Sequence, residues 1–392
     1  MNEVLADLLG WWRAGEPVGM ATVVGTWRSA PRPPGATMLV GPDGTAVGSV
    51  SGGCVEGAVY ELGQEVVASG EPRLVRFGVS DDDAFEVGLT CGGTIEIFVE
   101  RMDRSAFPEL EQVAEAITAG LPVAVATVVR APDGPDGSNG SNGLDGSNGP
   151  EGPVRVGARM VVWPDRRSGS LGSPRLDDAV SGDARGVLAT GRSGPVSYGS
   201  DGRRLGDEVT VFVSAYAPPP RMIVFGAIDF AGAAARVGAF LGYRVTVCDA
   251  RSVFATARRF PGVEVVVDWP HRYLAGQIEA GQVDTRTAVC VLTHDPKFDV
   301  PALKIALAAD FAYVGAMGSR RTHDDRLARL RAEGVPQERL ARLASPIGLD
   351  LGARTPEETA VSIAAEIIAA RWGGSGRSLS LLDGSIHDNL DR

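Results

Sequence analysis

Two pairs of glycines in the first hundred residues each stand next to a cysteine, a side chain that can act as a nucleophile or a metal ligand. The first turn precedes a run of helical periodicity and consists of Ser51, Gly52, Gly53 and Cys54. The second precedes an alternating run and consists of Thr90, Cys91, Gly92 and Gly93. Such turns leave backbone N–H groups open to a ligand, and the first turn of a helix stabilises a thiolate and attracts anions. We interpret the two turns as parts of one anion-binding mouth, with Cys54 in the first turn of its helix.

Cys54 also has a structural interpretation, in which it is a small buried hydrophobe packed where glycines let a helix approach a strand. An internal repeat bears on this choice. Three strand-like segments, 16–24, 35–40 and 94–99, recur at 121–129, 157–162 and 208–213. The repeat predicts two copies of one α+β unit within residues 1–217, namely 1–104 and 105–217. Ser173-Pro174-Arg175 replaces the first cysteine in the second copy and Leu205-Gly206 replaces the second, which favours a chemical role for the cysteines.

The elements that must position the first turn follow from periodicity. A helix over 2–14, a strand over 18–24 and a hairpin of two strands, 35–40 and 45–50, deliver the chain to Ser51, and a helix over 55–67 follows it. Further strands are expected at 74–77 and 94–100. The stretch from Pro132 to Pro153 is almost entirely Gly, Asp, Asn, Ser and Pro, which predicts a disordered surface insertion.

After the linker 217–220 the pattern changes to alternating strands and helices. Strands are expected at 222–225, 243–249, 263–267, 288–293 and 312–315, with helices at 232–241 and 301–309 and a final helix that a capping box at Thr355 begins. This alternation predicts a C-terminal, Rossmann-like, doubly wound parallel sheet over 221–376, followed by a tail, 377–392. The fold class is therefore α/β, with a duplicated α+β region before the parallel sheet.

Polar residues gather where the strands of the parallel sheet are expected to end, which is where open α/β sheets bind ligands. The candidates for a nucleotide-like pocket are Gly226, Asp229, Asp249, Arg251, His294, Ser319 and Arg320. Asp249 stands where a carboxylate would bind a ribose. Ile228, however, replaces the glycine that lets a backbone touch a pyrophosphate, which predicts weak binding of NAD(P) or none. His294 and Asp295 are more often a satisfied loop pair than a catalytic dyad.

Composition narrows the class of protein. A net charge of −11 without a basic stripe argues against nucleic-acid binding. The basic cluster Arg320, Arg321, Arg326, Arg329 and Arg331 is interleaved with acids, which is typical of a solvated helix face. Four separated cysteines indicate reduced thiols and no metal site. No signal-like N-terminus and no long apolar run are present, so we expect a cytoplasmic protein without a membrane anchor.

Several motifs in fixed order resemble the xanthine dehydrogenase accessory family, XdhC/CoxI, over nearly the whole chain. They are residues 29–36 (SAPRPPGA), 51–57 (SGGCVEG), 89–93 (LTCGG), 292–295 (LTHD), 315–322 (GAMGSRRT) and 346–358 (PIGLDLGARTPEE). The resemblance implies binding of molybdenum cofactor, a pterin dithiolene phosphate, and its delivery to an apo molybdenum hydroxylase. It also implies that Cys54, with Cys91 close behind, contacts the cofactor. The family's usual Gly-Ala-Gly turn is Gly226-Ala227-Ile228 here.

Three functions remain open at this stage. A binding and delivery protein for molybdenum cofactor explains both cysteine turns and the absence of a complete catalytic set. An NAD(P)-dependent oxidoreductase explains the βαβ unit, and a purely structural chaperone of the hydroxylase needs neither cysteine. The partners expected are the apo hydroxylase, a cysteine desulfurase and a second copy of the chain in a homodimer.

Overall fold

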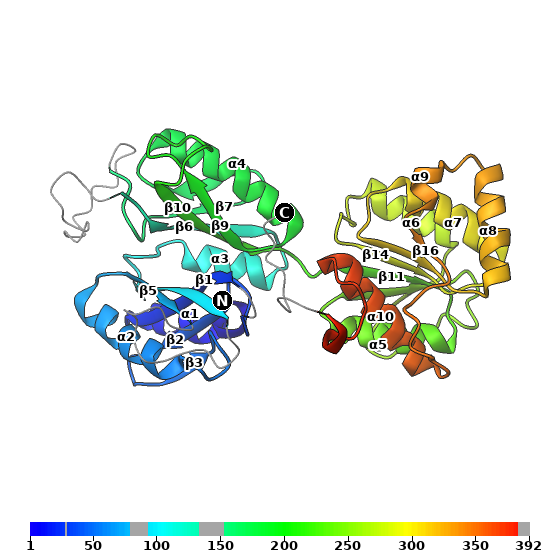
Figure 1. The fold of residues 1–392 in the computed structure, drawn as a ribbon, viewed down its shortest axis with the longest axis horizontal. Helices are drawn as coiled ribbons and strands as arrows, with labels where there is room; N and C mark the ends of the chain where they lie inside the picture. The colour runs from blue at the N-terminus through cyan, green and yellow to red at the C-terminus, as the bar shows by residue number, and fades with distance from the viewer. Residues whose placement is uncertain (28–29, 79–92, 133–152, 383–392) are drawn as a thin grey trace. The chain divides into compact units, whose positions relative to one another are not determined.

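Two units of different architecture make up the chain. The computed structural model describes residues 1–27, 30–78, 93–132 and 153–382, and internal contacts group these residues into Met1–Pro218 and Pro219–Leu382 (Figure 1).

The first unit contains two copies of one α+β arrangement. The first copy comprises η1 (Asn2–Val4), α1 (Leu5–Ala14), β1 (Val18–Trp27), β2 (Thr37–Val40), β3 (Ala46–Gly48), α2 (Glu56–Ser69), β4 (Arg73–Phe77) and β5 (Thr94–Met102). The second comprises α3 (Leu110–Thr118), β6 (Val123–Arg130), β7 (Arg159–Val162), β8 (Arg167–Gly169), α4 (Pro174–Thr190), β9 (Gly194–Tyr198) and β10 (Val209–Tyr216). The strand orders are β3-β2-β1-β5-β4 and β8-β7-β6-β10-β9, both antiparallel. The duplication predicted from the repeated segments is confirmed.

The two sheets of this unit are layered between α2 and α4. Ala21 and Val23 of β1 pack with α2, whereas Val24 meets Phe98, Val129 and Phe212 between the sheets. The central strand β1 is therefore covered on both faces, which explains its run of apolar residues without polar alternation. α4 covers the second sheet in the same way.

The second unit is a parallel sheet of order β13-β12-β11-β14-β15-β16 with helices on both faces. Its elements are β11 (Arg221–Phe225), α5 (Asp229–Phe240), β12 (Arg244–Cys248), β13 (Glu264–Val266), α6 (Pro270–Glu279), β14 (Ala288–Val291), α7 (Pro296–Ala308), β15 (Tyr313–Ala316), α8 (Arg320–Ala332), α9 (Gln337–Leu340), β16 (Leu343–Ala344), α10 (Pro356–Trp372) and η2 (Leu379–Leu381). This is the strand order of dinucleotide-binding folds, with a switch point between β11 and β14. The predicted Rossmann-like architecture is confirmed.

Two helices of the second unit show where the sequence predicted the start of a helix correctly and where it did not. The capping box that begins α10 is present as predicted, with Thr355 and Glu358 capping each other. α7, expected from Pro301, begins five residues earlier, because Asp295 caps it and Pro296 occupies its first position. Pro301 lies inside the helix.

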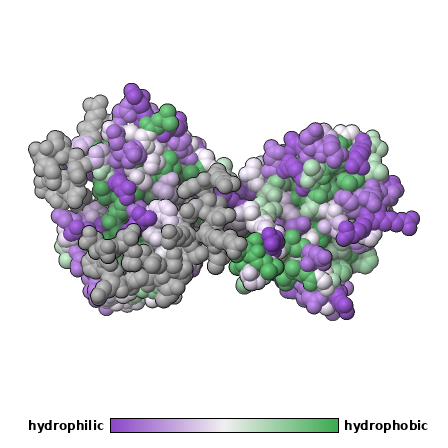
Figure 2. Space-filling view, viewed as in Figure 1, coloured by the Kyte–Doolittle hydropathy of each residue, from purple (hydrophilic) through white to green (hydrophobic). Residues whose placement is uncertain are grey.

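The basic cluster on α8 is only partly a solvated face. The surface of α8 in view is hydrophilic (Figure 2), but Arg326 is 3% exposed and forms an ion pair with the equally buried Asp299 (Nη2 to Oδ2, 3.0 Å). The prediction that Arg326 is solvated is wrong, because a helix face assigned from charge alone does not reveal a buried acid on a neighbouring helix. Among the described residues, no helix is long and apolar enough to cross a bilayer.

Deleting residues 132–153 and joining the ends with a short Gly-Ser link is expected to leave the melting temperature nearly unchanged. The insertion falls between β6 and β7, and residues 133–152 lie outside the described residues. Loop-closure entropy varies slowly, by about 0.6 kcal/mol per doubling of loop length. Calorimetric melting of the two chains checks this, and a large drop on deletion would show that the segment is packed.

Candidate functional site

The first cysteine turn joins β3 to α2 and is shaped by its two glycines. Gly52 and Gly53 have φ angles of 75° and 120°, which side chains rarely tolerate. Among the described residues, no heavy atom lies within 4 Å of where a Cβ would stand at either glycine. The glycines therefore serve the backbone conformation of the turn. Close approach of helix to strand occurs elsewhere, where a Cβ on Gly19 would lie 2.8 Å from the carbonyl oxygen of Gly63.

Cys54 lies just before α2, because the helix begins at Glu56 with Val55 as its N-cap. Its predicted place in the first helical turn is wrong by two residues. Cys54 is half-buried and packs against the cluster that contains Val50 and Val55. The turn thus holds this thiol at the border between core and surface.

The carboxylate of Glu56 accepts four hydrogen bonds from the turn. Oε1 accepts from Ser49 Oγ (2.6 Å) and the Ser51 N–H (2.9 Å), and Oε2 accepts from Ser51 Oγ (2.5 Å) and the Gly53 N–H (2.8 Å). Partial burial raises the pKa of Glu56, but the hydrogen bonds from Ser49 and Ser51 outweigh burial and lower the pKa to about 2. Glu56 is therefore ionised at neutral pH.

The remaining amides of the turn donate to the two serines. The Gly52 N–H donates to Ser49 Oγ (2.9 Å), and the N–H groups of Cys54 and Val55 both donate to Ser51 Oγ (2.9 and 3.0 Å). All five amides from 51 to 55 are satisfied within the turn. The expectation that these N–H groups face a ligand is wrong, because Ser and Glu side chains at a helix start cap it locally.

The ionised state of Glu56 gives the turn a defined dependence on pH. We expect the free energy of unfolding of wild type and Glu56→Gln to differ by a constant amount above about pH 5 and to converge as pH falls. The pKa of this carboxyl falls from its ordinary 4.5 to about 2 on folding, so its stabilisation is present above 4.5 and is lost as pH falls through 2. Urea unfolding from about pH 7 to about pH 3 checks this. A difference that stays constant throughout would contradict it.

The second copy repeats the acid but not the cysteine. Asp177 follows Gly169, the end of β8, at the same spacing as Glu56 follows Gly48, the end of β3. Asp177 is buried and accepts from the Leu171 N–H (2.8 Å). By the same spacing, Arg175 occupies the position of Cys54. An acid that ties the strand to the helix is thus shared by both copies, and the thiol belongs to the first copy alone.

The second cysteine turn is described only at its end. Thr90, Cys91 and Gly92 lie outside the described residues, and Gly93 is buried directly before β5. Ile95 of β5 belongs to the same hydrophobic cluster as Val55 and Cys54. The meeting of the two turns stays a prediction.

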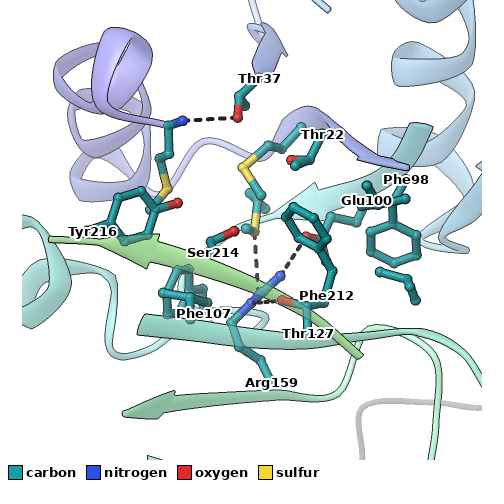
Figure 3. A pocket seen from close by; sticks show the side chains of 16 residues that line it. Thr22, Thr37, Phe98, Glu100, Phe107, Thr127, Arg159, Phe212, Ser214 and Tyr216 are labelled. Atoms are coloured by element: carbon teal, nitrogen blue, oxygen red, sulfur yellow. Dashed lines mark hydrogen bonds and ion pairs between the residues drawn. The ribbon is translucent and has the colours of Figure 1, made fainter. Parts of the chain in front are cut away.

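A cavity between the two sheets of the first unit contains a buried ion pair that the sequence did not reveal. Glu100 of β5 and Arg159 of β7 meet at 2.6 Å, and Arg159 lies over the ring of Phe107 (Figure 3). The cavity measures about 30 Å³ and is also lined by Thr22 and Thr127. This volume suits ordered water rather than a pterin, since ligand pockets usually exceed about 300 Å³. The pair joins the two copies across their interface.

The nucleotide-like candidates of the second unit lie at the carboxyl ends of its strands. Gly226 follows β11 with φ 105°, and a Cβ there would lie 2.7 Å from Thr293 Cγ2. Asp249 follows β12 and is 2% exposed. Its Oδ2 accepts from the Ala227 N–H and from Arg251 Nη2, both at 2.7 Å. The carboxylate predicted to bind ribose is thus engaged in holding the β11–α5 loop and Arg251.

The other candidates at this edge act as helix caps or surface pairs. Ile228 is the N-cap residue of α5, with a φ of −111° that any residue can adopt. Asp229 pairs with Arg259 at 3.0 Å. Asp295 caps α7 and pairs with Lys297 at 3.1 Å, and the neighbouring His294 is exposed. Ser319 caps α8, whose first residue is Arg320. Within the described residues no group of three or more His, Cys, Asp or Glu is placed to hold a metal ion.

NAD and NADP are expected to bind weakly or not at all. Ile228 puts a branched side chain where a pyrophosphate would need bare backbone, and a ribose would have to displace the hydrogen bonds of Asp249. Calorimetric titration of the wild-type chain and of Ile228→Gly checks this. A micromolar dissociation constant in wild type would contradict it and favour the oxidoreductase.

Two family models and several known proteins match the sequence of this chain. The model of the XdhC and CoxI family matches residues 11–78 and 149–199, and that of the XdhC Rossmann domain matches residues 222–367. A Bacillus subtilis (strain 168) protein, named as a probable xanthine dehydrogenase subunit, is 28% identical over 368 residues, covering 91% of this chain and 94% of that protein. The Escherichia coli (strain K12) "Molybdenum cofactor insertion chaperone PaoD" is 26% identical over 358 residues, covering 91% and 85%.

A solved structure has the same overall fold. A Bacillus halodurans protein described as a xanthine dehydrogenase is 25% identical, with 97% of each chain covered and a TM-score of 0.63. The similarity extends over both units of the chain, so the two architectures occur together in that relative as well.

Proposed function

Because this chain belongs to the XdhC and CoxI family, we propose that it binds molybdenum cofactor at the cysteine turn and delivers it to an apo molybdenum hydroxylase. The observation that carries the proposal is Cys54, which is half-buried in the turn of Gly52 and Gly53 and whose equivalent in the second copy is Arg175. A relative of similar length is a molybdenum cofactor insertion chaperone, which supports the assignment.

Cys54 suits the metal- and sulfur-bearing end of molybdenum cofactor, the cargo in this proposal. Molybdenum cofactor joins a pterin phosphate to molybdenum through two dithiolene sulfurs, and a thiol is a soft ligand of the kind that such metal–sulfur groups accept. Cys54 supplies that thiol at the surface of the turn. Cys248 and Cys290 do not compete for this role, because both are buried and burial raises the pKa of each thiol to about 12. Cys91 remains the second candidate ligand.

A transfer experiment tests delivery. The chain loaded with cofactor is mixed with an apo molybdenum hydroxylase, and the two proteins are then separated by size. Hydroxylase activity and pterin content are measured in each fraction. We expect pterin to leave the chain and activity to appear together. Activity that appears at the same rate with free cofactor would contradict delivery. A cysteine desulfurase and a second copy of the chain remain proposed partners, to be sought by co-purification and light scattering.

A further inference from the structure

The position of Glu56 determines which end of the cargo this turn can accept. A glycine turn that leads into a helix ordinarily attracts an anion, since its N–H groups lie near the positive end of the helix dipole. Here the carboxylate of Glu56 occupies that place and takes the Ser51 and Gly53 N–H groups itself. Ser51 Oγ takes those of Cys54 and Val55. An incoming phosphate would meet a negative charge and no free donor in this turn.

Comparison with the second copy shows which hydrogen bonds of this turn occur only in the copy that contains the cysteine. Asp177, the counterpart of Glu56, ties the start of α4 to Leu171. Gly172 stands at the position of Ser51, so the hydroxyl that links the acid to the amide of Cys54 belongs to the first copy. The shared acid ties strand to helix in both copies, and the added serine couples it to the backbone of Cys54.

We propose that Glu56 is a positioning residue that occupies the anion-accepting side of the turn before α2 and fixes the backbone around Cys54, so that the turn meets the sulfur- and metal-bearing end of the cofactor and excludes its phosphate. This inference rests on the proposed function for the identity of the cargo. Glu56 does not touch the cargo itself; it acts through the turn.

Alkylation of Cys54 tests the inference without any cofactor. The rate constants for neutral iodoacetamide and anionic iodoacetate are measured at Cys54 by peptide mass spectrometry, and their ratio reports the local charge. We expect the iodoacetate-to-iodoacetamide ratio to rise by about threefold in Glu56→Gln, because a unit charge near the thiol is removed. Glu56→Asp, which keeps the charge, is expected to restore the wild-type ratio, and Asp177→Asn is the matched control that leaves it unchanged.

A second arm uses the wild-type chain, so it decides the question even if Glu56→Gln does not fold. Inorganic phosphate is expected not to slow alkylation of Cys54 in wild type. Protection by phosphate, or the same reagent ratio in wild type and folded Glu56→Gln, would overturn the inference. Molybdenum cofactor that fails to protect Cys54 would instead count against the proposed function and leave the charge result standing.

Discussion

Replacing Cys54 by serine is expected to weaken binding of molybdenum cofactor more than about tenfold while the chain stays folded. The thiol is the soft ligand of the turn, and the N–H groups of residues 51–55 are already engaged within it. A hydroxyl is of similar size but is a far poorer ligand for a metal–sulfur group. The half-buried position of Cys54 tolerates this exchange without opening a large cavity.

The measurement is a titration of released cofactor into each variant, followed by quenching of tryptophan fluorescence. Cys248→Ser is the matched control, because Cys248 is buried in β12 and donates to the carbonyl oxygen of Asp268 (3.4 Å), a bond that a hydroxyl can also make. We expect wild-type affinity for Cys248→Ser. Equal affinity of wild type and Cys54→Ser would exclude this thiol as a ligand.

The second large effect is expected on stability, from Arg326→Met. Arg326 is buried against Asp299 and also donates to the carbonyl oxygen of Met317 (2.8 Å) and to Ser345 Oγ (3.1 Å). Removing one partner of a buried ion pair costs about 3–5 kcal/mol, because the other charge is left without compensation. The sheet of the second unit should therefore lose that much stability.

Hydrogen exchange of β14 and β15 peptides in increasing urea measures this loss locally. Arg329→Met is the control on the same helix, since its pair with Asp325 is exposed (3.3 Å) and such pairs contribute about 0.3–0.5 kcal/mol. Adding Asp299→Asn to Arg326→Met should recover part of the loss, because the uncompensated charge is removed. Equal effects of the two arginine variants would refute a stabilising role for the buried pair.

Features that depend on residues close together in the sequence were predictable. Thr355 and Glu358 indicate the start of α10 by spacing alone, and the repeated strands indicate two equivalent sheets. Alternation of strands and helices was sufficient for the parallel sheet, because parallel strands require crossover connections.

Features that depend on distant partners were not predictable. Arg326 and Asp299 lie on different helices, and Glu100 and Arg159 lie in different copies, so no spacing rule joins them. At the cysteine turn the interacting residues are close together in the sequence, but the glycine pair was interpreted as a source of free N–H groups. The nearby hydroxyls of Ser49 and Ser51 and the carboxylate of Glu56 were the signal that those groups would be satisfied internally.

The most direct test of cofactor binding is the pterin content of the chain purified from cells rich in molybdenum cofactor. Bound pterin is released, oxidised to its fluorescent form and quantified per mole of protein, with Cys54→Ser purified in parallel. We expect pterin in clear excess of background in wild type and its loss in Cys54→Ser. Wild-type chain that carries no pterin, or equal pterin in both chains, would contradict it.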